Sequence, residues 1–418
     1  MMFKTVAAAL VGNMLEVYDM VIYGLLSPII AQNFFPKQDK LVGIVDAFAI
    51  FFIGYLSRPL GALIFGRIGD RLGRKPALIS SIWLMVFSSF CLGLLPDYRA
   101  IAFWAPILLL FFRLLQGLSF GAEYPGSVIF LVEHAPKTQR GFYGCFAGIG
   151  AVLGLLLASL VTWLLHVYFS QSALLTWAWR LPFLLAVLGG FVGWFVRRRM
   201  PETELFYENY RLPASYFQSR RDFAKQLQRV VLIIGITLFA AVIVYLLYVF
   251  FVAYMTAVLN YKPYQALFIN TISIILLVFL NPLVAKLADR VGRRPMMALG
   301  LISTIMWAFP YFFLLQQHNL ALALLAQLVM TTVASAYLAV NLVTMVEIVP
   351  AQMRFTVVAF AYSITMSLFG GITPFLATLL IKLTHSYYSL ALYMSICALI
   401  SLITVIKVRE TKYVPQDI

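Results

Sequence analysis

A run of polar side chains interrupts the first apolar stretch of the sequence. Glu16, Asp19 and Tyr23 are spaced i, i+3, i+7, which places them on one face of a helix. A carboxylate in apolar surroundings is costly unless it faces a partner or a cavity. We therefore expect Glu16 or Asp19 either to exchange a proton or contact a bound solute, or to tie this helix to a neighbour.

Arg113, Gln116, Phe120 and Glu123 form a second polar face with the same helical spacing. The guanidinium of Arg113 presents a planar fork of donors that suits a carboxylate, and Glu123 can bind a proton or pair with Arg113. The alternative is a permanent ion pair of Arg113 with Asp19 or Glu123 that only holds the helices together. Both interpretations stay open from the sequence.

Residues typical of enzymes and metal sites are scattered. Cys91, Cys145 and Cys397 lie in apolar stretches without CxxC spacing, and the four histidines form no HExxH or paired motif. Nucleophile and nucleotide motifs are also missing. We expect no metal, no cofactor and no enzymatic activity.

The composition shows which elements must position these side chains. Of 418 residues, 62% are apolar and 11% are charged, against about 45–50% and about 25% in soluble domains. A crossing helix needs about 20 residues, so the chain has room for about a dozen spans. Hydropathy and polar punctuation predict helices at about 5–34, 42–66, 76–95, 101–133, 141–168, 180–197, 229–259, 264–286, 295–315, 320–349, 355–383 and 387–407. Several of these spans are longer than needed, which predicts tilting, or bending at internal glycine and proline.

The basic residues predict the orientation. Lys and Arg number 31 against 16 Asp and Glu, a net charge of +15. Twenty-three of them fall on the side of the two termini and six on the other side, while Arg58 and Arg113 fall inside predicted spans. Basic loops stay in the cytoplasm, so both termini are expected there. The net charge thus indicates membrane topology and no nucleic-acid partner.

The chain reads as two similar halves. A polar stretch, 197–228, separates an N-terminal half (1–196) from a C-terminal half (229–418) and has no apolar core of its own, as expected for a cytoplasmic linker. Gly66–Pro76 reads GRIGDRLGRKP and Ala285–Pro295 reads AKLADRVGRRP, an offset of 219. EHAPKTQR at Glu133–Arg140 returns as EIVPAQMR at Glu347–Arg354, an offset of 214. Two repeats at nearly one offset predict six helices in each half with the same orientation.

The first of these loops resembles the signature of the major facilitator superfamily, G-x-x-x-D-[RK]-x-G-[RK]-[RK], which is met by Gly66, Asp70, Arg71, Gly73, Arg74 and Lys75. GNMLEVYDMVIYG (Gly12–Gly24), RPLGALIFGRIGDRLGRK (Arg58–Lys75) and RLLQGLSFGAEYPGS (Arg113–Ser127) are similar to the metabolite:proton symporter family, which includes importers of proline, betaine, shikimate and other carboxylates.

The chain departs from the family pattern at two places. Val17 and Met20 replace aromatic residues of the usual E-W-[YF]-D-F, and GGEYGG becomes GAEYPG around Tyr124. The resemblance implies a fold of twelve transmembrane helices that works as a monomer. It also associates the R-x-x-Q-G pattern of Arg113 and Gln116 with proton coupling.

The repeated loops suggest a gate at the cytoplasmic side. An aspartate such as Asp70 can accept hydrogen bonds from the free N–H groups of a helix N-terminus and pair with an arginine. Asp289 with Arg293 is expected to do the same in the C-terminal half. Arg58 is assigned to this gate because of its nearness to the loop. The predicted gate residues are Arg58, Gly66, Asp70, Arg71, Gly73, Arg74, Glu133, Arg140, Asp289, Arg293, Glu347 and Arg354.

Three functions compete. The first is a proton-driven importer of a small zwitterion or organic anion in the bacterial inner membrane, with Glu16, Asp19, Tyr23, Arg113, Gln116, Glu123 and Tyr124 as coupling or binding residues. The second is an exporter of hydrophobic compounds on the same fold. The third, a membrane-embedded enzyme or receptor, lacks any supporting motif. The C-terminal half supplies neutral polar residues for a pocket: Tyr245, Tyr248, Tyr254, Asn270, Asn281, Gln327, Tyr337, Asn341 and Tyr362.

Overall fold

The structure, a computed structural model, describes residues 2–35, 40–72, 74–121, 123–198, 220–349 and 354–412. Every regular element in these ranges is a helix. The first helices are α1 (Met2–Leu25), α2 (Ser27–Phe34), α3 (Lys40–Leu56), α4 (Arg58–Leu72), α5 (Arg74–Leu94), α6 (Tyr98–Ile101), α7 (Trp104–Ser119), α8 (Glu123–His134), η1 (Lys137–Gln139), α9 (Arg140–Tyr168), α10 (Gln171–Thr176), η2 (Ala178–Arg180) and α11 (Leu181–Arg198). The others are α13 (Arg220–Val244), η3 (Tyr245–Phe250), α14 (Phe251–Ala253), η4 (Tyr254–Val258), α15 (Pro263–Val291), α16 (Arg293–Leu315), α17 (Leu320–Glu347), α18 (Arg354–Thr365), η6 (Met366–Gly370), α19 (Thr373–Thr384) and α20 (Tyr388–Lys407).

The predicted spans have counterparts among these helices. Within the described ranges, ten helices are long and apolar enough to cross a membrane, and α1 with α2, bent by 58°, adds an eleventh. A shorter apolar segment, Ile79–Leu94 in α5, stands at the third predicted span. The predicted class, an all-helical membrane protein, is confirmed.

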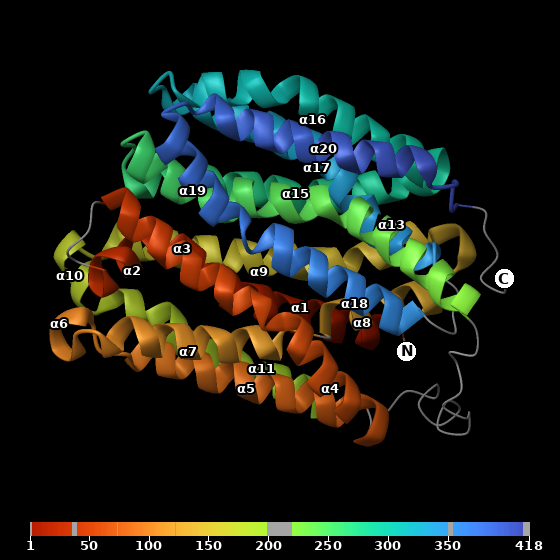
Figure 1. Ribbon diagram of the computed structural model, residues 1–418, viewed down its shortest axis with the longest axis horizontal. Helices are drawn as coiled ribbons and strands as arrows, with labels where there is room; N and C mark the ends of the chain where they lie inside the picture. Colours follow the sequence, from red (N-terminus) through yellow and green to blue (C-terminus); the bar gives the residue numbers. More distant parts are fainter. Residues whose placement is uncertain are drawn as a thin grey trace.

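Figure 1 shows how the helices are grouped. Helices α1–α11 (residues 2–198, the N-terminal half) fill the lower part of the view, and α13–α20 (residues 220–412, the C-terminal half) fill most of the upper part. Helix α1 begins and α20 ends at the same end of the bundle, which we call the terminus end. Helices α2, α6 and α10 lie at the opposite end.

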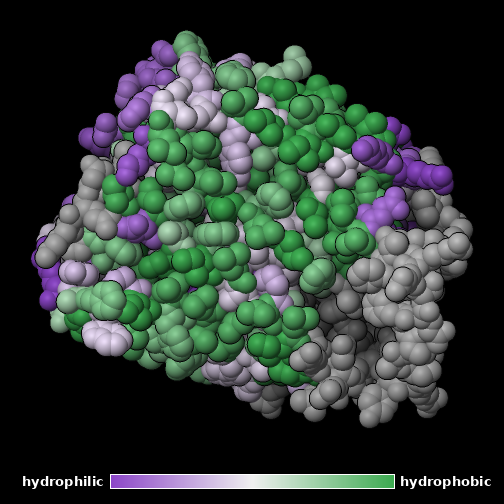
Figure 2. All heavy atoms as spheres, viewed as in Figure 1, coloured by the Kyte–Doolittle hydropathy of each residue, from purple (hydrophilic) through white to green (hydrophobic). Residues whose placement is uncertain are grey.

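The outer surface suits a bilayer. Figure 2 shows hydrophobic side chains across the middle of the face in view, with hydrophilic side chains gathered toward the two ends. Large apolar side chains in spanning helices are highly exposed, such as Leu188 (64%), Phe279 (67%) and Met306 (75%). Lipid removes the cost that water would impose on these side chains.

Two long spans are interrupted just before a helical turn that contains proline, between α1 and α2 and between α3 and α4. Pro28 lies in the first turn of α2 and Pro59 in that of α4, where a missing N–H breaks no helical hydrogen bond. At the second break, the Ser57 hydroxyl donates to the carbonyl oxygens of Gly54 (2.7 Å) and Leu114 (2.8 Å). The break is thereby attached to α7, and α4 starts deep inside the bundle with Arg58.

Two glycines let α3 and α4 touch α7. A Cβ atom on Gly61 would lie 1.8 Å from the carbonyl oxygen of Leu118, and one on Gly117 would lie 1.8 Å from that of Gly54. A larger residue at either position would force the backbones apart. This close contact brings Arg113 and Gln116, on the same helix, into the interior of the N-terminal half.

Candidate functional site

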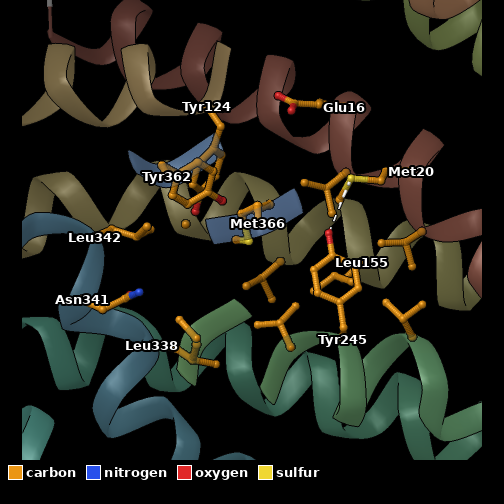
Figure 3. A pocket seen from close by; sticks show the side chains of 18 of the residues that line it. Glu16, Met20, Tyr124, Leu155, Tyr245, Leu338, Asn341, Leu342, Tyr362 and Met366 are labelled. Carbon is orange, nitrogen blue, oxygen red and sulfur yellow. Dashed lines mark hydrogen bonds between the residues drawn. The ribbon is translucent and has the colours of Figure 1, made fainter. Parts of the chain in front are cut away.

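A cavity lies between the two halves, lined by residues from both of them. Measured as the space that the centre of a water molecule can reach, it has a volume of about 100 Å³, enough for several waters. Figure 3 shows side chains from both halves pointing into it. The residues that carry its polar and sulfur atoms are Glu16, Met20, Arg58, Tyr124, Tyr245, Asn281, Asn341, Tyr362 and Met366.

One ion pair lines this cavity. A terminal nitrogen of Arg58 lies 3.4 Å from Oε1 of Glu16, and both residues are nearly fully buried, at 2% and 4% exposure. The same nitrogen donates to the carbonyl oxygen of Phe120 at 3.3 Å, and the other terminal nitrogen reaches the sulfur of Met20 at 3.8 Å. Arg58 therefore belongs to the central cavity and not to the terminus end where the sequence assigned it. Helix α4 begins at Arg58, so the residue lies more than two turns from Asp70.

Tyrosine rings form another part of the cavity wall. The rings of Tyr124 and Tyr362, one from each half, stack with their centroids 5.3 Å apart. Across the cavity, the Tyr245 hydroxyl donates to the sulfur of Met20 at 3.6 Å (dashed line in Figure 3) and forms a hydrogen bond with the hydroxyl of Tyr55. Tyr55 belongs to the N-terminal half, so this bond joins the two halves beside the cavity.

Asp19 lies in a second, separate polar cluster. Its carboxylate accepts hydrogen bonds from the Ser89 hydroxyl and from Nε2 of Gln116 at 2.9 Å. Gln116 also donates to Ser89 at 2.7 Å, and its side-chain oxygen accepts from Arg113 at 2.7 Å. Asp19, Ser89 and Gln116 are fully buried inside the N-terminal half. None of the four residues lines the central cavity.

Arg113 reaches Asp19 only through Gln116. In the part of the chain that the structure describes, Arg113 makes no direct ion pair, and its Nε atom has no hydrogen-bond partner. Its guanidinium lies over the rings of Tyr23 (4.4 Å to the centroid) and Phe51 (5.1 Å), where cation–π attraction partly replaces water. The direct Arg113–Asp19 pair considered from the sequence is thus replaced by an amide bridge.

Contacts between the halves close the cavity toward the end opposite the termini. Phe48 packs against Phe250 with the ring centroids 6.0 Å apart, and the Ser367 hydroxyl donates to the carbonyl oxygen of Tyr55 at 2.8 Å. The tyrosine pair described above belongs to the same region. This closure is largely aromatic.

Polar contacts join the halves at the terminus end. The carboxylate of Asp289, in α15, accepts from the backbone N–H groups of Gly141 (3.0 Å) and Phe142 (2.9 Å) in the first turn of α9. Arg293 donates to Asp289 at 2.7 Å. We call these contacts the Asp289 latch. A negative charge at a helix N-terminus is favourable because the exposed N–H groups and the helix dipole both stabilise it.

Behind the latch, the end of the chain folds onto α16 and α17. Arg293 also pairs with Glu347 at 3.3 Å, and the Thr411 hydroxyl donates to Glu347 at 2.6 Å. Glu410 accepts from the backbone N–H groups of Arg293 (2.8 Å) and Arg294 (3.0 Å) at the start of α16. Arg140 is buried at the first position of α9.

Several predicted residues cannot be placed in this way. The side chains of Asp70, Arg71, Arg74, Glu123, Glu133 and Arg354, and the surroundings of Gly66, are outside what the structure describes, and Gly73 lies outside the described residues altogether. The predicted linker falls mostly in 199–219, which also lies outside them.

The structure adds residues that sequence reasoning missed. Ser89 completes the Asp19 cluster, and Tyr55 joins the halves beside the cavity. A serine pair in the middle of an apolar span, Ser88–Ser89, was the available signal for the first. Tyr55 carried no signal, because tyrosine is common at helix ends and interfaces in membrane proteins.

Comparison with known proteins agrees with this architecture. Residues 9–374 match the model of the Major Facilitator Superfamily. The chain is 33% identical to the glycine betaine/proline/ectoine/pipecolic acid transporter OusA of Dickeya dadantii, over 99% of this chain and 84% of the relative. It is 32% identical to the proline/betaine transporter of Escherichia coli K12 (98% and 83% covered) and 30% identical to the shikimate transporter of that strain (96% and 93% covered).

Solved structures share the fold. A crystal structure of a D-xylose-proton symporter superposes with a TM-score of 0.79 at 19% identity, covering 98% of each chain. The xylose transporter XylE from E. coli in a partially occluded inward-open conformation gives 0.74 at 19% identity, covering 99% of each chain. The resemblance predicted from the sequence is confirmed. The chain belongs to the Major Facilitator Superfamily, whose members are transporters and not enzymes, and it groups there with the proline/betaine, ectoine and shikimate transporters of the metabolite:proton symporter family.

Proposed function

We propose that this chain is a symporter that takes up a small zwitterionic or anionic metabolite together with protons, by alternating access through the central cavity. The observation that carries the proposal is a cavity between the halves that has an ion pair in its wall and inter-half contacts on each side. These contacts are the Asp289 latch toward one end and the aromatic closure toward the other. Alternating access needs two such closures that open one at a time.

The Asp19 cluster is the proposed proton site. The carboxyl group of Asp19 is buried and accepts hydrogen bonds from two neutral side chains, Ser89 and Gln116. Arg113 donates to the side-chain oxygen of the same Gln116. A proton arriving at Asp19 would weaken its bond from Gln116 and so change how Arg113 is held. Because α1 carries both Asp19 and the cavity residue Glu16, that change can pass to the substrate site through one helix.

The orientation follows from the basic residues: we place both termini in the cytoplasm, and the Asp289 latch as the cytoplasmic gate. The remaining predicted gate residues keep this assignment as part of the proposal, except Arg58. We propose a monomer as the working unit, because both halves that line the cavity belong to one chain.

Proteoliposomes that contain the purified chain test the proposal. A pH gradient, acidic outside, should drive accumulation of radiolabelled glycine betaine, proline or shikimate, and a protonophore should abolish it. Asp19→Asn should lose accumulation against a gradient while the variant still exchanges substrate across the membrane. If the unaltered protein takes up substrate at the same rate with and without the pH gradient, proton coupling is refuted.

The exporter of hydrophobic compounds has less support. That function calls for a large apolar cavity, whereas the cavity here is small and has a buried ion pair in its wall. Efflux of a lipophilic dye from the same proteoliposomes, driven by the opposite gradient, would favour it.

A further inference from the structure

Two spans of the C-terminal half contain π-helical turns beside the central cavity. One is η3, which follows α13, and the other is η6, which lies between α18 and α19. At the end of η6, the N–H of Gly371 donates to the carbonyl oxygen of Met366, five residues back, at 2.8 Å. Single π turns inside α-helices are rare and occur frequently at functional sites. We therefore asked what holds these two turns and what they position.

Two side-chain amides hold the backbone of η3. Nε2 of Gln327, in α17, donates to the carbonyl oxygen of Leu247 at 3.0 Å. Nδ2 of Asn270, in α15, donates to the carbonyl oxygen of Tyr248 at 3.1 Å. The side-chain oxygen of Gln327 accepts from the Tyr311 hydroxyl at 2.6 Å, which fixes the amide in this orientation. In an α-helix, each carbonyl accepts instead from the N–H four residues on, so both amides favour the π form of this turn over the α form.

η3 supplies the C-terminal half's side of the aromatic closure. Tyr245 begins the turn and forms the hydrogen bond with Tyr55, and Phe250 ends it and packs against Phe48. A π turn contains one residue more than an α turn, and one helical residue corresponds to a rotation of about 100° and a rise of about 1.5 Å. A change of η3 to the α form would therefore rotate Tyr245 relative to Phe250 by about 100°. Both side chains could not then keep their partners in the N-terminal half.

The second π turn packs against the same tyrosine pair. A Cβ atom on Gly370 would lie 2.7 Å from Cε2 of Tyr245, and one on Gly371 would lie 2.6 Å from Cβ of Tyr55. Ser367, also in η6, donates to the carbonyl oxygen of Tyr55 at 2.8 Å. The tyrosine pair thus lies against both π turns, and a shift of either turn would disturb it.

We propose that η3 and η6 are the hinges of a gate at the end opposite the termini, and that Gln327 and Asn270 keep this gate closed by holding η3 in its π form. When the amides release the two carbonyls, η3 becomes α-helical, Tyr245 turns away from Tyr55, and the cavity opens toward that end. The inference rests on the proposed alternating access and assigns the residues that control one of its two openings. It depends neither on the identity of the substrate nor on proton coupling.

Thiol labelling of the cavity from that end tests the inference. Leu155 lines the cavity on α9 and is replaced by cysteine in a chain whose three native cysteines are alanine. Gln327→Leu leaves the Leu247 carbonyl without its donor in the π form but costs the α form nothing. In right-side-out vesicles, this variant should therefore be labelled about tenfold faster by a membrane-impermeant maleimide. In inside-out vesicles, the rate should not rise.

Gln316→Leu is the matched control for this change. Gln316 also donates to a backbone carbonyl, that of Phe312 at 2.9 Å, but at the end of the regular helix α16. Its replacement should leave the labelling rate unchanged in both kinds of vesicle.

Gly370→Ala tests the second hinge. The added methyl group would collide with the ring of Tyr245, so the closed form becomes less favourable and labelling in right-side-out vesicles should again rise about tenfold. Gly43→Ala is its control, because a Cβ atom there would meet Ala31 at an ordinary contact distance of 3.5 Å. This control should be labelled at the rate of the unaltered protein.

The outcomes separate this inference from the proposed function. If Gln327→Leu does not fold, Gly370→Ala decides. Labelling at the control rate in both variants overturns the inference, and proton-driven uptake by the unaltered protein would then leave the transport function standing. Faster labelling in both kinds of vesicle also overturns it, because a general loosening of the bundle would be the cause. Faster labelling in right-side-out vesicles alone supports the inference, and if uptake is then independent of the pH gradient, only the proton coupling is refuted.

Discussion

Replacing Asp289 by asparagine is expected to open the terminus end of the bundle. In the structure, both carboxylate oxygens are used by the first turn of α9, through Gly141 and Phe142, and Oδ1 also pairs with Arg293. Asparagine keeps one oxygen acceptor and loses the charge. It also puts an N–H donor where a backbone N–H already points, so one of the two helix contacts becomes repulsive.

The size of the effect follows from these contacts. A hydrogen bond to a charged group contributes about 1.5–3 kcal/mol against about 0.5–1.5 for a neutral one. The bond that remains therefore loses about 1–1.5 kcal/mol and the bond that is broken loses about 1.5–3, or about 2.5–4.5 kcal/mol together. Arg293 keeps its second carboxylate, Glu347, which limits the further loss. The ratio of latched to open protein should therefore fall about 70- to 2,000-fold.

Thiol labelling measures this ratio. A cysteine placed at Leu342, which lines the cavity on α17 five residues before Glu347, reports access from the terminus end. The three native cysteines are first replaced by alanine. In inside-out vesicles, Asp289→Asn should raise the rate of labelling by a membrane-impermeant maleimide at least about tenfold. The reason is that the conformation open at the terminus end becomes more populated.

Asp97→Asn is the matched control. Asp97 also accepts from a helix N-terminus, at 3.1 Å from the N–H of Ala100, but within one half and at the opposite end of the bundle. Its replacement should leave the labelling rate unchanged. If Asp289→Asn gives the same rate as the control, or if it only lowers the unfolding temperature without a change in labelling, the Asp289 latch is not the gate.

Three further changes test other parts of the structure. Gln116→Leu removes the amide that bridges Asp19 and Arg113, so proton-driven accumulation in proteoliposomes should fall about tenfold or more, and normal accumulation would contradict the bridge. Met20→Phe restores the aromatic residue of the family pattern and takes up space in a cavity of about 100 Å³. The affinity for glycine betaine should therefore fall about tenfold in a thermal-shift titration. An unchanged affinity would show that Met20 does not limit the space for the ligand. Burial raises the pKa of Glu410, but bonds from the backbone N–H groups at the start of α16 and from Lys412 outweigh it, so the pKa lies below its usual 4.5. The carboxylate therefore stabilises the fold above that pH and loses its effect as the pH falls through the lowered pKa. The gap in unfolding temperature between the unaltered protein and Glu410→Gln should stay constant from pH 7 to about 5 and close in stronger acid.

Hydropathy alone was sufficient to predict where the membrane helices lie in the sequence. Each of the twelve predicted segments coincides with one helix or with a run of consecutive helical elements, because burying backbone in lipid leaves no alternative to helical hydrogen bonding. The breaks were only partly predictable. Pro28 and Pro59 mark two of them, whereas the π-helical turn Tyr245–Phe250 has no proline or glycine to announce it.

The chemistry of the Asp289 latch was predictable. The repeated loop contains Asp289 and Arg293, and an aspartate there was expected to bind a helix N-terminus. The identity of that helix was not predictable. Gly141 and Phe142 lie 148 and 147 residues away in the chain, and nothing in their sequence marks them as the acceptor's partners. Only the packing of α15 against α9 decides it.

The two polar faces show where sequence reasoning ends. The sequence by itself determined that Glu16, Asp19 and Tyr23 share a side of one helix, and that Arg113 and Gln116 share a side of another. The tertiary structure decided that Asp19 turns toward Ser89 and Gln116 while Glu16, one turn earlier, turns to Arg58 and the cavity. Helical spacing fixes directions only around one axis. Which neighbour stands in each direction depends on how closely the helices pack. Here Gly61 sets the distance between α4 and α7, and Gly117 sets the distance between α7 and α3.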